Sequence, residues 1–204
     1  MKTIQPTILK RNSSLSGLTT NDNDDKKMVL SGHAAVFDKP TVLWECGDIQ
    51  YKEVIDRHAF DETDISNCCL KYNHSDHVPI LARVRSGNLK ITTDSIGLKF
   101  DAELFDISSS RDVYSLIKEG GLDSCSFAFT IKEESYDTET RTRRILKIDK
   151  LFDVSIVDFP AYADTDVSAR AFFELENEKE KALENESLEL EKRKAILKLK
   201  LKLN

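Results

Sequence analysis

The sequence predicts a mainly β protein with flanking helices, an α+β fold, followed by a charged helical tail. Between residues 29 and 162, short segments rich in β-branched and aromatic side chains recur, separated by Gly, Asp, Asn and Ser. These segments are VLSGHAAVF, NLKITTD, GLKFDAEL, SCSFAFTI, RRILKID and LFDVSIVDF. So many short strands predict a closed or curved β-barrel or a tightly curved sheet.

Two short helical segments interrupt the predicted strands. In SSSRDVYSLIKEGG, apolar residues recur at helical spacing, Ser110 is a candidate N-cap, and Gly120–Gly121 ends the pattern. A second short helix or helical turn is predicted to begin near Asp56, in DRHAFDET. Both segments are expected to flank the β core.

The composition divides the chain into three parts. Residues 1–28 end in TTNDNDDKK, which predicts a mobile N-terminal arm, and residues 29–170 form the β-rich domain. Residues 171–204 contain no Gly or Pro, and the order of Glu first and Lys later complements a helix dipole. Three leucines seven residues apart form a coiled-coil seam too short to be convincing. The final LKLKLKL alternates like a strand, which leaves its state open.

The overall composition narrows the class of protein. A net charge of −6 over 204 residues argues against a general nucleic-acid binder, which normally carries a basic face. Four cysteines without a CxxC pair favour reduced thiols in a cytosolic protein over a disulfide framework or zinc ribbon. No apolar run reaches signal-peptide length or the roughly 20 residues that span a bilayer. We therefore expect a soluble, intracellular protein without membrane partner or cofactor.

The first candidate for chemistry is His74, in YNHSDH directly after an apolar run. A histidine at a strand end suits a general base, because its ordinary pKa lies near neutral pH. A purely structural, hydrogen-bonding histidine is the common alternative. A metal site is a further alternative, although its spacing matches no recurrent zinc pattern. Its ligands would be Cys68, Cys69, His74, Asp76 and His77.

The second candidate is Ser126, in LDSCSFAF. Small residues alternate there with Cys125 and two phenylalanines, so a strand would place the small residues on one face and the large ones in the core. A serine on the small-residue face has open space for a substrate carbonyl, but it needs an adjacent base to become a nucleophile. Close packing between strands is the alternative reason for small residues. Cys125 is expected to point inward, where a thiol is usually inert.

The third candidate is Asp153, in LFDVSIVDF. An acid inside an apolar strand is costly unless it is paired. It could accept the Nδ1 hydrogen of His74, as the acid of a catalytic triad does. A structural ion pair with a Lys or Arg explains the residue equally well.

Taken in order, these segments resemble the tailed-phage prohead (procapsid) maturation serine protease family, which is related to the herpesvirus assemblins. The resemblance covers roughly residues 28–168. It rests on SGHAAVFDKP, EVIDRHAFDET, LKYNHSDHVPILARV, GNLKITTDSIGLKFDAEL, LIKEGGLDSCSFAF and LFDVSIVDFPAYADTDV, six blocks in the family's order. The sequence departs mildly from the family at Ala128 and His58, where Gly is usual. It departs again at Asp153, where the family usually has Glu.

The resemblance implies an assemblin-like β-barrel fold in residues 29–170, with His74 and Ser126 as the catalytic pair and Asp153 as the third member. It gives no role to His58. The donors of the oxyanion hole are not indicated, and backbone amides or the Arg141–Arg144 cluster are the candidates considered. A cysteine hydrolase that pairs Cys125 with His74 is a distant alternative.

The resemblance also implies the partners and the setting. The substrates would be the scaffold protein and the major capsid protein, inside the viral procapsid in the host cell cytoplasm. Self-cleavage beyond about Phe172 and a homo-oligomer are further expectations, and the tail suits contact with capsid or scaffold chains. The alternative function is a non-enzymatic capsid assembly or scaffold protein that retains the protease fold.

Overall fold

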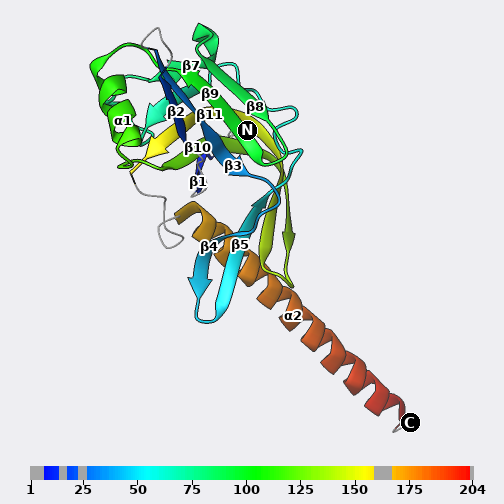
Figure 1. The fold of residues 1–204 in the computed structure, drawn as a ribbon. Helices are drawn as coiled ribbons and strands as arrows, with labels where there is room; N and C mark the ends of the chain where they lie inside the picture. The colour runs from blue at the N-terminus through cyan, green and yellow to red at the C-terminus, as the bar shows by residue number, and fades with distance from the viewer. Residues whose placement is uncertain (1–6, 14–17, 23–26, 159–166, 203–204) are drawn as a thin grey trace. The chain divides into compact units, whose positions relative to one another are not determined.

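The computed structural model describes residues 7–13, 18–22, 27–158 and 167–202 (Figure 1). The chain separates into two units, Met1–Thr165 and Asp166–Asn204. In chain order the described elements are β1 (Leu9–Ser13), β2 (Thr19–Asp22), β3 (Met28–Val36), β4 (Thr41–Cys46), β5 (Ile49–Ile55), β6 (Cys69–Tyr72), β7 (Ala82–Arg83), the 3-10 helix η1 (Val84–Ser86), β8 (Leu89–Thr93), β9 (Gly97–Glu103), α1 (Ser108–Lys118), β10 (Ser124–Asp137), β11 (Thr142–Val157) and α2 (Val167–Lys202).

The strands form two sheets. One has seven strands, in which the path β1-β10-β11-β5-β4 is extended by β6, which pairs with β11 and with β7. The other has four strands in the order β2-β3-β9-β8. Strand β11 is antiparallel to β10, but parallel to β5 at Thr142–Ile145 and to β6 at Asp153–Ile156. This change of partner along β11 brings β6 beside the half of the β10–β11 hairpin that carries Ser126.

The expected closed barrel is wrong for the part of the chain that the structure describes. Strands β1 and β4 end the longest path of the larger sheet and do not pair with each other, so that sheet stays open. Instead, four register shifts interrupt the pairing of the long β10–β11 hairpin between Ala128 and Glu134. Such bulges increase local twist and bend without closing a barrel.

All six segments predicted as strands lie largely or wholly in strands, and the last two join into β11. Strands β1 and β2 correct the expectation of a mobile arm over residues 1–28, because both pair within the sheets. Their polar composition hid them, since an edge strand needs few apolar side chains. The rest of that arm, apart from residues 7–8, 18 and 27–28, lies outside the described residues. The domain limits themselves stay a prediction.

The two sheets share one hydrophobic core. Its fully buried aromatic members include Phe100 from the smaller sheet and Phe127 and Phe129 from the larger. The rings of Phe127 and Phe129 stack with centroids 4.9 Å apart. Helix α1 adds Val113, Tyr114 and Ile117 to the same core. This packing fixes which face of β10 points inward.

The helices differ in detail from the predictions. Helix α1 begins at Ser108, so its N-cap is Ile107, and the expected cap Ser110 lies fully buried inside the helix. The end is as predicted, since Gly120 has φ +74° and donates its N–H to the carbonyl of Ile117. The segment after Asp56 is a hydrogen-bonded turn rather than a helix, with the N–H of Ala59 donating to the Asp56 carbonyl.

The tail forms helix α2, and the helical prediction is confirmed. The helix starts at Val167 and continues to Lys202, so the described part of LKLKLKL, residues 197–202, whose state the sequence left open, is helical. The Leu183 and Leu190 side chains of the considered seam are more than half exposed. No helix in the described ranges combines the length and apolar character needed to cross a bilayer.

Candidate active site

Three neighbouring strands deliver the three residues singled out from the sequence. Ser126 lies on β10, Asp153 lies on β11, and His74 follows β6 by two residues. Ser126 pairs across the hairpin with Ser155, and Asp153 pairs with Ala128 on one side and Cys69 on the other. Because directly paired residues and residues two apart share a face, Ser126 and Asp153 project from the same side of the sheet.

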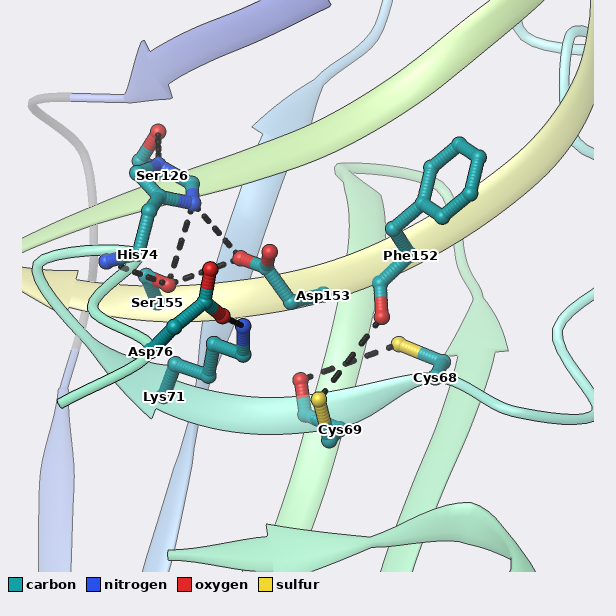
Figure 2. Close-up of polar contacts among 9 residues, drawn as sticks. All are labelled: Cys68, Cys69, Lys71, His74, Asp76, Ser126, Phe152, Asp153 and Ser155. Atoms are coloured by element: carbon teal, nitrogen blue, oxygen red, sulfur yellow. Dashed lines mark hydrogen bonds and ion pairs between the residues drawn. The ribbon is translucent and has the colours of Figure 1, made fainter. Parts of the chain in front are cut away.

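The side chains of His74, Ser126 and Asp153 form a hydrogen-bonded chain (Figure 2). Nε2 of His74 lies 2.6 Å from Oγ of Ser126, and Nδ1 lies 2.6 Å from Oδ1 of Asp153. The carboxylate can only accept, so Nδ1 carries the hydrogen and Nε2 accepts from the Ser126 hydroxyl. This is the tautomer in which histidine serves as a base toward serine.

The loop that carries His74 is held in an uncommon backbone conformation. Asn73 and His74 have φ values of 52° and 53°, in the left-handed region that Asn tolerates better than most residues. Nδ2 of Asn73 donates to Oδ2 of Asp158 at 2.7 Å, and the Asp158 N–H donates back to Oδ1 of Asn73 at 3.1 Å. Tyr72 also donates to Asp158, and this hydrogen bond raises the pKa of the tyrosine. We call these contacts of Asp158 with Tyr72 and Asn73 the Asp158 clamp. The sequence pattern did not indicate Asp158, and the Asn before the histidine is the one feature that points to the clamp.

Comparison with known proteins identifies the family. The model of the caudovirus prohead serine proteases matches residues 16–181. The chain belongs to this family. No curated protein matches it. Among solved structures, it is similar to the bacteriophage T4 capsid assembly protease gp21, with 11% sequence identity and a TM-score of 0.46 over 76% of this chain and 99% of that one.

In this member of the prohead protease family, the small-residue face of β10 is not open as expected. Ser126 is 0% exposed, and its neighbours on that face, Ser124, Ala128 and Thr130, are all buried. Strand β10 is an internal strand, with β1 pairing along one edge and β11 along the other. Oγ of Ser126 is therefore enclosed by its neighbours in this structure.

The other face of β10 confirms the expectation for Cys125. Its side chain is fully buried on the core side with Phe127 and Phe129. Burial, with a smaller contribution from the charge of Asp123, raises the pKa of this thiol to about 12. A raised pKa favours the protonated thiol, and its place on the core side of β10 keeps it away from His74, which argues against Cys125 as a nucleophile.

The residues considered as metal ligands do not come together around one centre. Burial raises the pKa of the Cys68 and Cys69 thiols, which lie near backbone carbonyls rather than near a shared centre. Asp76 pairs with Lys71 at 2.6 Å, and the His77 side chain is exposed. Within the described residues, no three His, Cys, Asp or Glu side chains form a group able to hold a metal ion.

The remaining candidates lie apart from the site. His58 is exposed and pairs with Asp61 at 3.0 Å. Arg144 pairs with Asp38 and Asp56, each at 2.8 Å. It lies eleven positions before Ser155, the residue of β11 opposite Ser126, and its register partner on β10 is Ser135, in the far half of the hairpin. Arg144 is therefore unsuited to an oxyanion hole beside Ser126.

Proposed function

We propose that this chain is a serine endopeptidase that cleaves scaffold and major capsid proteins during procapsid maturation. The observation that supports it most is the double contact of His74, with Ser126 at Nε2 and Asp153 at Nδ1. Membership of the prohead serine protease family supports the same activity. The setting proposed is the interior of the viral procapsid in the host cell, where the protease would meet its substrates and further copies of itself.

The proposed reaction is acyl transfer through Ser126. His74 takes the hydroxyl proton at Nε2 while Oγ forms a bond to the scissile carbonyl carbon. The imidazolium then gives that proton to the leaving amine, and the C–N bond breaks to leave an acyl-enzyme. Water attacks the ester in the same way and restores the free serine. Asp153 keeps the histidine in the required tautomer throughout.

A fluorophosphonate probe tests the assignment without a known substrate. Such a probe bonds its phosphorus to an activated serine oxygen and releases fluoride. We expect peptide mapping to find the adduct on Ser126, and neither Ser126→Ala nor His74→Ala to be labelled. Cys125→Ala is the matched control and should label as the unmodified chain does.

Cleavage of the scaffold and major capsid proteins of the same virus, mixed with the purified protease, tests the substrates. A chain that neither labels nor cleaves would contradict the proposal. It would favour a non-enzymatic assembly role.

A further inference from the structure

We infer that Ser155 is a positioning residue that holds both Asp153 and His74 for the reaction. The inference rests on the proposed function, and it concerns a residue that the sequence analysis did not single out. Ser155 lies on β11, two residues after Asp153 and directly opposite Ser126 on β10. It therefore projects from the same face of the sheet as both residues.

One hydroxyl group contacts two members of the catalytic chain (Figure 2). Oγ of Ser155 lies 2.7 Å from Oδ1 of Asp153 and 3.2 Å from the backbone nitrogen of His74. Ser155 is 0% exposed. Bulk water therefore does not compete for these hydrogen bonds, and losing one would leave a buried polar group unsatisfied.

The roles of donor and acceptor follow from the chemistry of the groups. A serine hydroxyl has one hydrogen, and the Asp153 carboxylate can only accept, so Ser155 donates to Asp153. The backbone N–H of His74 can only donate, and it uses a lone pair of Oγ. Oδ1 of Asp153 thus accepts from Ser155 and from Nδ1 of His74, and Ser155 fixes the oxygen that selects the histidine tautomer.

The second contact acts on the backbone of His74. This residue has φ 53°, a conformation that a non-glycine residue keeps only when its surroundings hold it. The hydrogen bond from its N–H to Ser155 is one such restraint, and the Asp158 clamp on Asn73 is another. Ser155 therefore positions the imidazole through its backbone, through its acid partner and directly, since Oγ of Ser155 also lies 3.2 Å from Nδ1 of His74.

The test is the rate of inactivation by the fluorophosphonate probe, separated into a maximal rate constant and an apparent affinity. We expect Ser155→Ala to lower the maximal rate constant about 10- to 100-fold, as the loss of a hydrogen bond to a charged group would, with little change in affinity. Ser155→Thr keeps the hydroxyl and should restore most of the rate. Ser155→Cys keeps the side-chain volume with only a weak donor, so its maximal rate constant should fall by a similar factor. This variant takes the place of Ser155→Ala if the latter folds poorly.

Two further measurements separate positioning from a general structural effect. Ser110 is equally buried, and its hydroxyl has no hydrogen-bond partner among the described residues, so Ser110→Ala is the matched control and should leave the rate unchanged. The proton on Nδ1 of His74, shared with a carboxylate, should give a far-downfield NMR resonance. We expect it in the unmodified protein and expect it to shift or broaden in Ser155→Ala.

Four outcomes decide the inference. Unchanged rates in folded Ser155→Ala or Ser155→Cys would overturn it, as would an unchanged proton resonance. A loss of rate that Ser155→Thr fails to restore, and that Ser110→Ala matches, would show a packing effect instead. An unmodified protein that shows the resonance but never reacts would contradict the proposed function and leave Ser155 as a positioning residue of an inactive site.

Discussion

Nε2 of His74 lies 2.6 Å from Oγ of Ser126, although 52 residues separate them in the sequence. Asp153, a further 27 residues along, completes the chain at 2.6 Å from Nδ1. Strand β11 pairs with β10 along one edge and with β6 along the other, so β10, β11 and the residues that follow β6 supply these contacts. Five predictions follow from this arrangement and from the contacts that hold the strands together.

Replacing Ser126 with Ala should abolish cleavage, with a rate loss on the order of 10⁶-fold as for nucleophiles of related mechanism. Because Ser126 is buried and its hydroxyl bonds to His74, we expect a small stability cost of about 1 kcal/mol. Urea unfolding and a cleavage assay measure the two effects. Residual cleavage near the unmodified rate, with Cys125 intact, would exclude the serine.

Asp153→Asn should slow the reaction less than His74→Ala. The acid orients His74 and stabilises its positive charge, and in a related triad its replacement costs about 10⁴-fold. The histidine itself moves the proton, so its removal should cost more. The fluorophosphonate probe makes the comparison, since folded Asp153→Asn should still react at a measurable maximal rate while folded His74→Ala should not be labelled. Equal losses would show that Asp153 does more than orient the base.

The buried ion pair of Arg11 and Glu53 should stabilise the packing of β1 beside β10. The guanidinium bonds both carboxylate oxygens at 2.5 and 3.0 Å, and both side chains are more than 90% buried. Among the residues that the structure describes, Arg11→Met would leave Glu53 with the 3.5 Å contact to Arg143, so we expect a loss of about 3 kcal/mol.

The matched control for this pair is Lys27→Met. Lys27 pairs with Glu103 at 3.1 Å, with both side chains nearly half exposed, and its loss should cost under about 1 kcal/mol. Chemical unfolding of both variants measures the difference. Similar costs for the two would show that β1 contributes little to the fold.

Acid should remove a contribution to stability that depends on Asp94. The hydrogen bond with His33, strengthened by the N–H groups of Gly97 and Ile96, lowers the pKa of Asp94 to about 2. A carboxyl group whose pKa is lowered by folding stabilises the folded state at pH values above the ordinary pKa of aspartate, roughly 3.9. This stabilisation disappears as the pH falls toward about 2.

The difference in unfolding free energy between the unmodified chain and Asp94→Asn should therefore shrink between pH 5 and pH 2. Urea unfolding at several pH values across this window measures it. A difference that stays constant would show that the carboxylate charge is irrelevant to the turn.

The protease should cleave its own chain when concentrated. Enclosure in a shell gives neighbouring copies a high effective concentration, which favours cleavage between them. The expected position beyond about Phe172 falls inside helix α2, which begins at Val167, so cleavage there requires the first turns to unwind. Residues 159–166, which precede the helix, lie outside the described residues.

Intact-mass measurement on concentrated unmodified protein and on Ser126→Ala, incubated side by side, checks this. We expect fragments only from the unmodified chain. A mass that stays at 23.2 kDa while added scaffold protein is cut would show that the tail is retained.

The sequence by itself determined the mainly β class, the six principal strand segments and the helical tail. It also determined that Ser126 and Cys125 face opposite sides of β10, because the two-residue period of a strand is a local property. His74 and Asp153 could be selected as candidates by residue type and by resemblance to the family.

Only the tertiary structure decided what these residues contact. The register of β10 on β11 and the parallel pairing of β6 with β11 join segments distant in sequence, and no local pattern encodes them. The same pairing buries Ser126, which the sequence predicted to be open, and brings the hydroxyl of Ser155 to Asp153. The polar segment β1 is a strand because it pairs with β10, and its Arg11 bonds Glu53 across 42 residues; local propensity contains neither contact.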